Sequence, residues 1–489
     1  FVPYFNQQTG GAGYSVTNLQ STPGTTPVQV YFPYFQGNSH RYTGIAVANW
    51  GTTPADVQFK AYDNDGTPTS TPAEIINPRM VTIPPGAQIA MLAEQIHGLS
   101  LDDPRNGWIQ AQSSSGQVTG FFLDGDIGPN FLDGAVAGNQ LYKNLYFTQT
   151  QLGTTVTPGS DFSNLIDVVN PSATPANLTF TLMGGNSNEA QGKATRTLSA
   201  NGRLAEDLSS LFTGITKPRT NGYVTVTSDV GLVGYQSVDT GTTVYSLPAQ
   251  PASTATTLYS AQFASGGAGA VRYFTDINLI NTSGQTRNLQ VRLVDNNGTP
   301  VQVSGIKNPA SITLPATQQL RARGENVFNL PDAASATSIV EGSLVITADG
   351  PGVVGDVTFG DALAQKFMAA LPLDGNPVST LVFSQVAQGG GEARPYFTGI
   401  AMYNPNPTAV SVAIDVYSDQ GAKTGSAVYL LGAGARVSRT LPQLVPAITE
   451  QVRGYIRLTS SGGPVSAFEL FGSQNLDFLT AVPAQPINP

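Results

Sequence analysis

Apolar and polar residues alternate with a period of two along one kind of segment that recurs through the chain. The alternation is clearest in residues 57–61, 289–293 and 410–415. Successive side chains of a strand point to opposite faces, so this pattern buries one face and leaves the other in water, as in antiparallel sheets. The segments are therefore predicted to be half-buried β-strands.

The alternating strand belongs to a longer series of landmarks that occurs about four times in the same order. An aromatic strand comes first, and a strand that ends in Asn and a turn follows it. The alternating strand is third. An apolar strand with a short Leu-rich segment follows it, and a strand entered through Gly is last. The second landmark reads TGIAVANWG (43–51), NLIDVVNPS (164–172), TDINLINTS (275–283) and TGIAMYNPN (398–406). Repetition of one scaffold with varied polar residues is more typical of an array than of a single-site catalyst.

The repeats are expected to span residues 28–141, 142–254, 255–377 and 378–489, each long enough to bury its own core. Strands separated by turn signals every 8–12 residues or so are typical of β-sandwiches. The predicted fold is all-β, with tandem immunoglobulin/fibronectin-like sandwiches that each carry one short helix. The joints between the repeats are short and rich in Pro or small residues, which favours a semi-rigid rod of touching domains.

The short helix of each repeat is expected in the Leu-rich segment that follows the apolar strand. These segments are residues 89–98, 203–214, 322–333 and 436–447. One apolar stripe on so short a helix needs tertiary support, so Leu204, Leu208 and Leu211 should face a core. We interpret the helix as a plug on one end of the sandwich, with a ligand lid as the alternative.

The first 27 residues resemble the front of a repeat whose remainder is missing. FVPYF (1–5) echoes YFPYF (31–35), and YSVTNLQS (14–21) echoes the second landmark. A partial sandwich cannot bury its own apolar face, and an exposed strand edge recruits a partner strand. We therefore expect this segment to pair with another copy of the chain. The expected subunit-interface residues are Phe1, Val2, Tyr4, Phe5, Tyr14, Val16 and Leu19.

The composition is that of a secreted all-β protein. Charged residues make up 11% of the 489 residues, the net charge is −9, and Lys and Arg form no basic cluster, so neither nucleic acid nor an anionic membrane is an expected partner. Cys is absent, which excludes disulfides and Cys-based sites, and no uninterrupted apolar run reaches membrane-spanning length. A start at Phe1 without Met fits a mature product secreted by a bacterium, although a truncated chain would look the same. We expect an extracellular or cell-surface location and no cofactor.

The strongest candidate for metal binding is YDNDGTP (62–68), where Asp63 and Asp65 precede Gly66 as at the start of a calcium loop. The downstream bidentate Glu of such a loop is missing. The other repeats carry GGNSN, DNNGTP and SDQGAK at this place, which share turn-forming Asn, Asp or Gly. Hairpin chemistry is therefore the preferred interpretation, and no bound metal is expected.

Other polar residues give weaker signals. Asp124, Asp126 and Asp133 could supply an acid/base pair for glycoside hydrolysis, but the other repeats keep at most part of the pattern. His40 and His97 are the two His residues, too few for a zinc site. Trp50 and Trp108 could form a sugar platform, but core packing or a domain joint is the preferred interpretation. No catalytic residue is expected.

The segments YFTGIAMYNPNP, VAIDVYSDQG and RGYIRLTSSGGPVSAFELFG resemble tandem repeats of secreted bacterial surface proteins. This resemblance implies a β-sandwich fold and a cell-surface location, and it implies no activity. An incomplete sandwich beside complete ones is also similar in arrangement to the donor-strand subunits of pilus-type fibres.

Together these features favour a non-enzymatic structural subunit of an extracellular filament or surface layer that assembles head-to-tail through its N-terminal segment. The expected partners are copies of the same chain, and surface glycans are a second class of partner. The alternative is a secreted adhesin or carbohydrate-binding array, and an enzyme is the least favoured class. An exposed aromatic cluster with convergent polar groups would favour the adhesin, and a deep pocket with two carboxylates would favour an enzyme.

Overall fold

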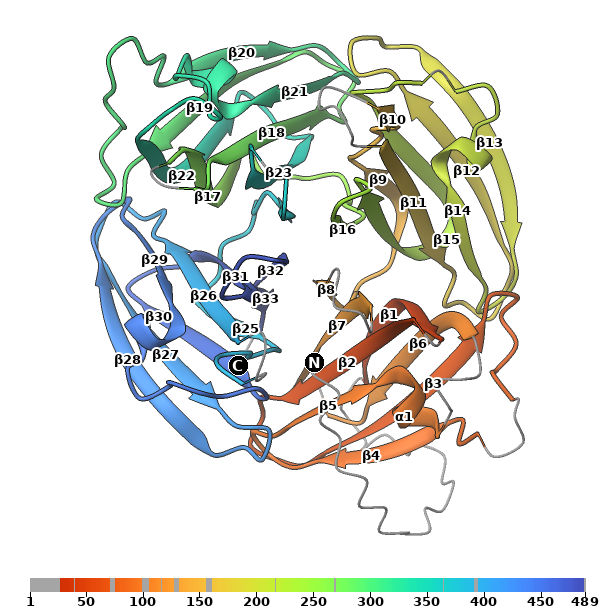
Figure 1. Cartoon of the computed structure of the whole chain (residues 1–489). Coiled ribbons are helices and arrows are strands. Elements are labelled where there is room, and N and C mark those ends of the chain that lie inside the picture. The colour runs from red at the N-terminus through yellow and green to blue at the C-terminus, as the bar shows by residue number, and fades with distance from the viewer. Residues whose placement is uncertain are drawn as a thin grey trace.

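A computed structural model describes residues 27–487 apart from 39, 71–74, 99–104, 116, 127–131, 155–160, 216, 268–269, 364 and 391–394. The described chain is almost entirely β, with four short helices. None of its helices has the length and hydropathy needed to span a membrane. Four groups of consecutive strands surround a common centre (Figure 1), and we call these groups the first to fourth repeats.

The first repeat consists of two four-stranded sheets. The outer sheet has the order β1 (Val28–Gly37), β6 (Arg105–Ser113), β3 (Ala55–Asp63), β4 (Arg79–Ile83). The inner sheet has the order β5 (Gln88–Leu92), β2 (Arg41–Asn49), β7 (Val118–Asp126), β8 (Leu132–Val136). The helix α1 (Ala93–His97) follows β5 directly.

The second repeat has the same order, but its long strand β15 (Tyr223–Asp239) serves both sheets. The outer sheet is β9 (Tyr142–Phe147), β15, β12 (Ala176–Met183), β13 (Ala190–Leu198). The inner sheet is β14 (Arg203–Asp207), β11 (Asp161–Val169), β15, β16 (Val244–Pro248), and β10 (Gly153–Thr154) also pairs with β11. The helix α2 (Leu208–Leu211) follows β14.

The third repeat joins its two sheets through one residue pair between β17 and β18. The outer sheet is β17 (Thr257–Gly266), β22 (Ile339–Ala348), β19 (Arg287–Val294), β20 (Ala310–Leu314). The inner sheet is β21 (Gln319–Arg323), β18 (Tyr273–Asn281), β23 (Val353–Asp361), β24 (Met368–Pro372). The helix α3 (Gly324–Phe328) follows β21.

The fourth repeat adds a short terminal strand to the outer sheet. The outer sheet is β33 (Gln485–Pro486), β25 (Thr380–Phe383), β30 (Tyr455–Ser461), β27 (Val410–Tyr417), β28 (Lys423–Leu431). The inner sheet is β29 (Arg436–Thr440), β26 (Tyr396–Tyr403), β31 (Ser466–Ser473), β32 (Leu479–Pro483). The helix α4 (Leu441–Leu444) follows β29.

All four repeats thus share one strand order, in which the outer sheet runs 1-6-3-4 and the inner sheet runs 5-2-7-8. In an immunoglobulin sandwich the first strand lies beside the second and the seventh beside the sixth. Here the first strand lies beside the sixth, the seventh beside the second, and the fourth beside the third instead of the fifth, while the pairs 2-5 and 3-6 keep the immunoglobulin pattern. The all-β prediction is confirmed, and the strand order differs from the immunoglobulin type at these three strands.

The helices are shorter than the sequence pattern predicts, because each expected helix begins in residues that belong to the fifth strand of its repeat. Leu204 lies on β14, which pairs with β11, whereas Leu208 and Leu211 belong to α2 and are 0% and 3% exposed. A short apolar run does not distinguish a strand from a helix by periodicity alone. The plug prediction holds for the short helices, each of which packs apolar side chains on the core of its repeat.

The repeats close into a ring, so the expected rod is wrong. The eighth strands β8, β16, β24 and β32 are here called the hub strands. Figure 1 shows β8, β16 and β32 around the centre of the ring. β8 contacts both β16 and β32, and β24 contacts the same two strands, so the fourth repeat returns to the first. In the described chain no β-ladder joins one repeat to another, so side chains and single backbone contacts hold the ring together. Radial closure of this kind is the arrangement found in β-propellers.

Apolar side chains fill the contacts between neighbouring inner sheets. Between the first and fourth repeats, Phe121 meets Phe471 edge-to-face with ring centroids 6.0 Å apart, and Leu132 and Val482 are buried in the same cluster. Between the first and second repeats, Phe122 lies against Tyr235 at 5.1 Å. Closure therefore removes from water the apolar faces that the ends of a rod would expose.

Candidate functional site

The turn that carries the candidate calcium ligands is a closed hairpin connection. The backbone N–H of Gly66 donates to the carbonyl oxygen of Asp63 at 2.9 Å. Oδ1 of Asp63 accepts from the Thr69 hydroxyl at 2.7 Å, and Oδ1 of Asp65 accepts from both the backbone and the hydroxyl of Thr67. These hydrogen bonds lower the pKa of Asp65. Among the described residues no group of three or more His, Asp or Glu is arranged to hold a metal.

The same turn docks on the second repeat, a role that the sequence did not reveal. The carbonyl oxygen of Asn64 accepts from the backbone N–H of Arg203 at 2.9 Å, and Oδ1 of Asn64 accepts from the guanidinium of Arg203 at 3.0 Å. This guanidinium also pairs with buried Asp167 and lies 5.1 Å from the ring centre of Tyr34. One Arg side chain thus ties the first repeat to the core of the second.

Trp108 completes this contact as part of a domain joint. Its indole Nε1 donates to the carbonyl oxygen of Asn201 at 2.7 Å, and its ring stacks on Tyr62 with centroids 4.7 Å apart. Tyr223 has the corresponding place in the second repeat, and its hydroxyl donates to the Thr317 carbonyl oxygen at 2.8 Å. Both side chains are buried, so neither offers a platform for a sugar.

All four junctions of the ring use the same backbone contact. The 3–4 turn of one repeat accepts a hydrogen bond from the first residue of the fifth strand of the next repeat. The pairs are Arg203 N to Asn64 O at 2.9 Å, Gln319 N to Gly185 O at 2.8 Å, Arg436 N to Asn296 O at 3.1 Å and Gln88 N to Asp419 O at 3.0 Å. Asn, Asp or Gly recurs at this turn in the sequence of every repeat. The structure shows that the turn forms a contact between neighbouring repeats.

Glycine is required at three of these turns by both conformation and space. Gly66, Gly298 and Gly421 have φ values of 88°, 82° and 85°. A Cβ atom on Gly66 would lie 2.0 Å from the carbonyl oxygen of Ala200 in the next repeat. Residues other than Gly rarely adopt this φ. The neighbouring atom belongs to the backbone, which cannot move aside to make room for a Cβ atom as the end of a flexible side chain can.

The candidate carboxylates of the first repeat face the interior. Asp124 and Asp133 are opposite each other on β7 and β8 and are 9% and 3% exposed. Asp124 pairs with Arg41 at 2.6 Å, and burial raises its pKa to about 7. Oδ1 of Asp133 accepts from the Thr480 hydroxyl of the fourth repeat at 2.8 Å, and burial raises its pKa to about 6. The Asp133–Thr480 hydrogen bond joins the hub strands β8 and β32, and both Asp124 and Asp133 are buried, whereas Asp126 ends β7 half-buried.

The remaining candidates are separate from one another. His97 is buried at the end of α1, its Nδ1 lies 3.0 Å from the Ile76 carbonyl oxygen, and burial lowers its pKa to about 4. His40 is exposed. Trp50 packs at the junction of the fourth and first repeats beside a cluster that includes Tyr455. The expected interface residues Phe1, Val2, Tyr4, Phe5, Tyr14, Val16 and Leu19 lie outside the described residues.

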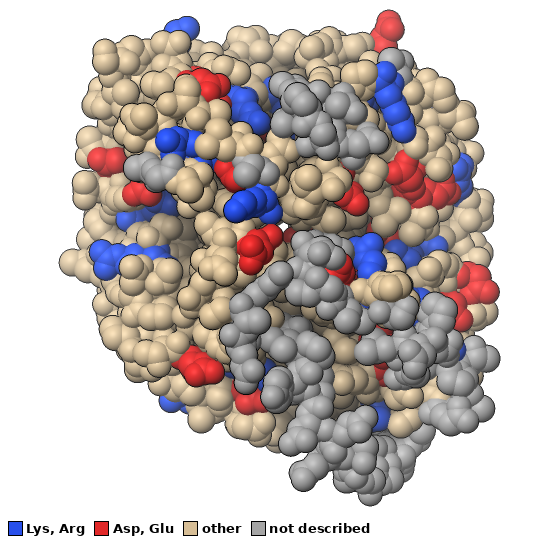
Figure 2. Space-filling view, in the orientation of Figure 1, with Lys and Arg blue, Asp and Glu red and all other residues tan. Residues whose placement is uncertain are grey.

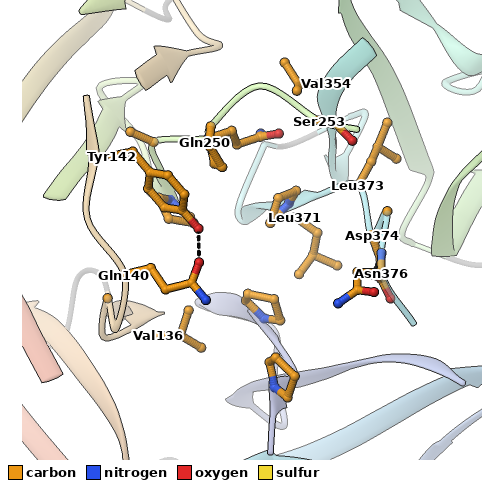
Figure 3. A pocket seen from close by; sticks show the side chains of 18 of the residues that line it. Val136, Gln140, Tyr142, Gln250, Ser253, Val354, Leu371, Leu373, Asp374 and Asn376 are labelled. Atoms are coloured by element: carbon orange, nitrogen blue, oxygen red, sulfur yellow. Dashed lines mark hydrogen bonds between the residues drawn. The ribbon is translucent and has the colours of Figure 1, made fainter. Parts of the chain in front are cut away.

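A cavity of about 1070 Å³ lies near the ring axis, where the chain passes from one repeat to the next. Residues of all four repeats line it, and the hub residues Val136 and Leu371 are among them. In Figure 3, Gln140 and the Tyr142 hydroxyl that donates to it lie across the cavity from Asp374. We call this the axial cavity.

The lining of the axial cavity is mainly uncharged. Among its described residues, Lys143 and Asp374 are the charged ones, and burial raises the pKa of Asp374. Tyr, Asn, Gln and Ser side chains supply hydrogen-bonding groups beside Leu, Val and Pro. The cavity suits a neutral molecule that presents hydroxyl or amide groups beside apolar surface.

Comparisons with known proteins identify no family. No protein-family model and no curated protein matches the chain. Among solved structures, the dimeric latent PorU of Porphyromonas gingivalis is 8% identical with a TM-score of 0.14, and the alignment covers 75% of this chain and 32% of that one. A glycoside hydrolase family 32 structure from Bifidobacterium adolescentis is 11% identical, also with a TM-score of 0.14, and the coverage is 91% and 99%. The chain spans about a third of the length of the PorU chain. These likenesses are too weak to carry an argument about fold or function.

Proposed function

We propose that the protein is a non-enzymatic structural subunit of an extracellular filament or surface layer. The observation that carries this proposal is the use of its polar groups. The candidate polar groups make contacts inside the ring and do not line an open site. The turn of Asp63 and the indole of Trp108 contact the second repeat. Asp133 bonds to the fourth repeat, and Asp124 pairs with Arg41. In an enzyme, groups of this kind would converge on an accessible pocket.

Two further observations support a building block. The ring is closed, and each repeat packs against both of its neighbours through buried side chains. Figure 2 shows charged side chains only in small, mixed groups on a mostly uncharged face. A surface with few charges lets copies pack without burying unpaired charge. We further infer that the repeats are variants of the immunoglobulin-like sandwich in which the first, fourth and seventh strands lie in the opposite sheet.

Assembly through the N-terminal segment is tested by removing residues 1–27. The full chain and the shortened chain are compared by electron microscopy and sedimentation velocity over a range of concentrations. The proposal expects filaments or sheets from the full chain and folded single rings from the shortened chain. Equal assembly of both chains would exclude the segment, and a full chain that remains a single ring would exclude the structural role.

The axial cavity favours a second function, a secreted adhesin that binds a neutral glycan. Tyr142 and Gln140 on one wall and Asn376 on the other place an aromatic ring and amides around one space (Figure 3). Binding to a panel of neutral glycans is measured by calorimetry for the parent chain and for Tyr142→Ala. The matched control is Tyr429→Ala, which lies on β28 and outside the cavity lining. Loss of binding in the first variant alone would support the adhesin, and absence of binding by the parent would exclude these ligands.

A further inference from the structure

The fourth strand of each outer sheet forms an edge of that sheet, and the four edges differ in protection. β4 and β20 have five residues each and follow Pro78 and Pro309 directly. β13 has nine residues and carries Lys193 and Arg196 along its length. Short strands, Pro and charged side chains are the usual means of preventing an edge from pairing with another chain.

β28 of the fourth repeat lacks these protections. It has nine residues, and its single charge, Lys423, is at its first position and pairs with Asp415 at 2.9 Å. No charged residue or Pro occurs between Thr424 and Leu431. In the described chain β28 pairs only with β27, so its other edge has no strand partner.

Exposed apolar side chains also distinguish β28. Val428 is 67% exposed and Leu430 is 78% exposed, the two largest values among the exposed large apolar residues of the described chain. The register of the third and fourth strands aligns the repeats, since Leu431 faces Val410 as Leu198 faces Ala176.

The corresponding positions of the other repeats are more polar. They hold Met80 and Thr82 in the first repeat, Thr195 and Thr197 in the second, and Ser311 and Thr313 in the third. Three repeats therefore carry Thr or Ser at most of these places, while the fourth presents an apolar pair on an open edge. Solubility does not require Val and Leu at these exposed positions, and exposed apolar side chains of this kind are typical of interaction sites.

We propose that the edge of β28 accepts a strand from the N-terminal segment of a second copy, with residues 14–19 as its centre. This inference rests on the proposed structural role and names the acceptor that this role requires. Strand addition of this kind joins main chains by hydrogen bonds and derives specificity from alternate side chains.

Charge and spacing favour this occupant. Residues 1–26 contain no Asp, Glu, Lys, Arg or His, so pairing with the uncharged length of β28 buries no unpaired charge. Tyr14 and Val16 are two residues apart, as are Val428 and Leu430, so each pair falls on one face of its strand. Aromatic and β-branched side chains that face each other across strands stabilise such pairing.

The resulting contact would propagate. Each copy gives its N-terminal segment to one neighbour and keeps its own β28 free for another. The contact is therefore head-to-tail, and copies keep adding to the chain unless a closed oligomer forms. The intramolecular ring is already complete without this edge, because its junctions use other parts of the repeats. Assembly therefore requires no opening of the ring.

The absence of Cys allows a direct test by disulfide trapping. A tagged Val16→Cys chain is mixed with an untagged Leu430→Cys chain under mild oxidation, and linked chains are read on a non-reducing gel. The matched control replaces Leu430→Cys by Thr197→Cys, the corresponding position on β13. We expect linked pairs of tagged and untagged chains with Leu430→Cys and at least tenfold fewer with Thr197→Cys. Equal linkage to both positions would overturn the proposal.

A second measurement uses residues that the chain itself carries at the corresponding places. The double variant Val428→Thr and Leu430→Thr copies Thr195 and Thr197 of the second repeat. It should keep the melting temperature of the parent while the concentration needed for assembly rises at least tenfold in sedimentation velocity. Unchanged assembly of this variant would overturn the acceptor site and leave the structural role standing. A parent chain that does not assemble at any concentration would overturn both.

Discussion

Asp133 gives the ring closure a pH signature that can be measured. It lies on β8, is 3% exposed, and accepts a hydrogen bond from Thr480 of the fourth repeat. Burial raises its pKa to about 6, whereas an Asp in an unfolded chain has a pKa of about 3.9. The folded ring therefore favours the neutral acid. Asp133→Asn keeps the shape and the accepting oxygen but cannot become charged.

The sign follows from proton binding. Between pH 4 and pH 6 the folded chain holds more protons at this site than the unfolded chain, so the contribution of Asp133 to stability falls as pH rises. The contribution is fully present below the unfolded pKa and is lost above the folded pKa. A difference of about 2 pKa units corresponds to about 3 kcal/mol at pH 8. An unfolding entropy of about 1 kcal/mol/K for a chain of this length turns this into a shift of about 3 °C.

The assay compares melting temperatures of the parent and of Asp133→Asn at pH 4 and pH 8. The variant should gain about 3 °C on the parent between pH 4 and pH 8. Asp65→Asn is the control, because hydrogen bonds from Thr67 lower the pKa of exposed Asp65 and the effect should have the opposite sign. A difference between Asp133→Asn and the parent that stays the same at both pH values would refute the reasoning.

Three further predictions concern the cores, the metal and the junctions. Leu208→Ala should lower the free energy of unfolding by about 2–5 kcal/mol, because Leu208 is fully buried in the second core, and no loss in denaturant melts would show that the segment lies on the surface. A chelator should leave the melting temperature unchanged and Asp63→Asn should be mild, whereas a melt lowered by EDTA and restored by calcium would contradict the hairpin interpretation. Gly66→Ala should lower the melting temperature more than Gly284→Ala, where an added Cβ meets nothing within 4 Å, and equal effects would contradict close docking of the turn.

The strands and cores could be predicted from the sequence because they depend on local alternation. Residues 57–61 alternate as expected on β3, with Val57, Phe59 and Ala61 all buried. The sequence pattern predicts helices where the fifth strands lie, since a five-residue segment with so few apolar positions fits either period. Leu204 shows the ambiguity, because it continues the Leu spacing of α2 but lies on β14.

Ring closure could not be predicted, because its contacts join residues that are far apart in sequence. The backbone N–H of Gly134 donates to the Thr480 hydroxyl at 3.0 Å across 346 positions of the chain. The hub strands have five residues each, and the sequence alone predicts that these short apolar segments are joints between domains. The sequence predicts a hairpin at the turn of Asp63. The residue that this turn contacts, Arg203, begins a strand of the next repeat. No local pattern connects these two positions.

Small-angle scattering of the single-ring fraction tests the closed ring most directly. A compact body of 489 residues has a radius of gyration of about 23 Å. Four domains of this size in a line, each with a radius of gyration of about 14 Å and spaced about 35 Å apart, give about 40 Å. The account predicts a value close to the compact one, and a value close to that of the line would contradict ring closure.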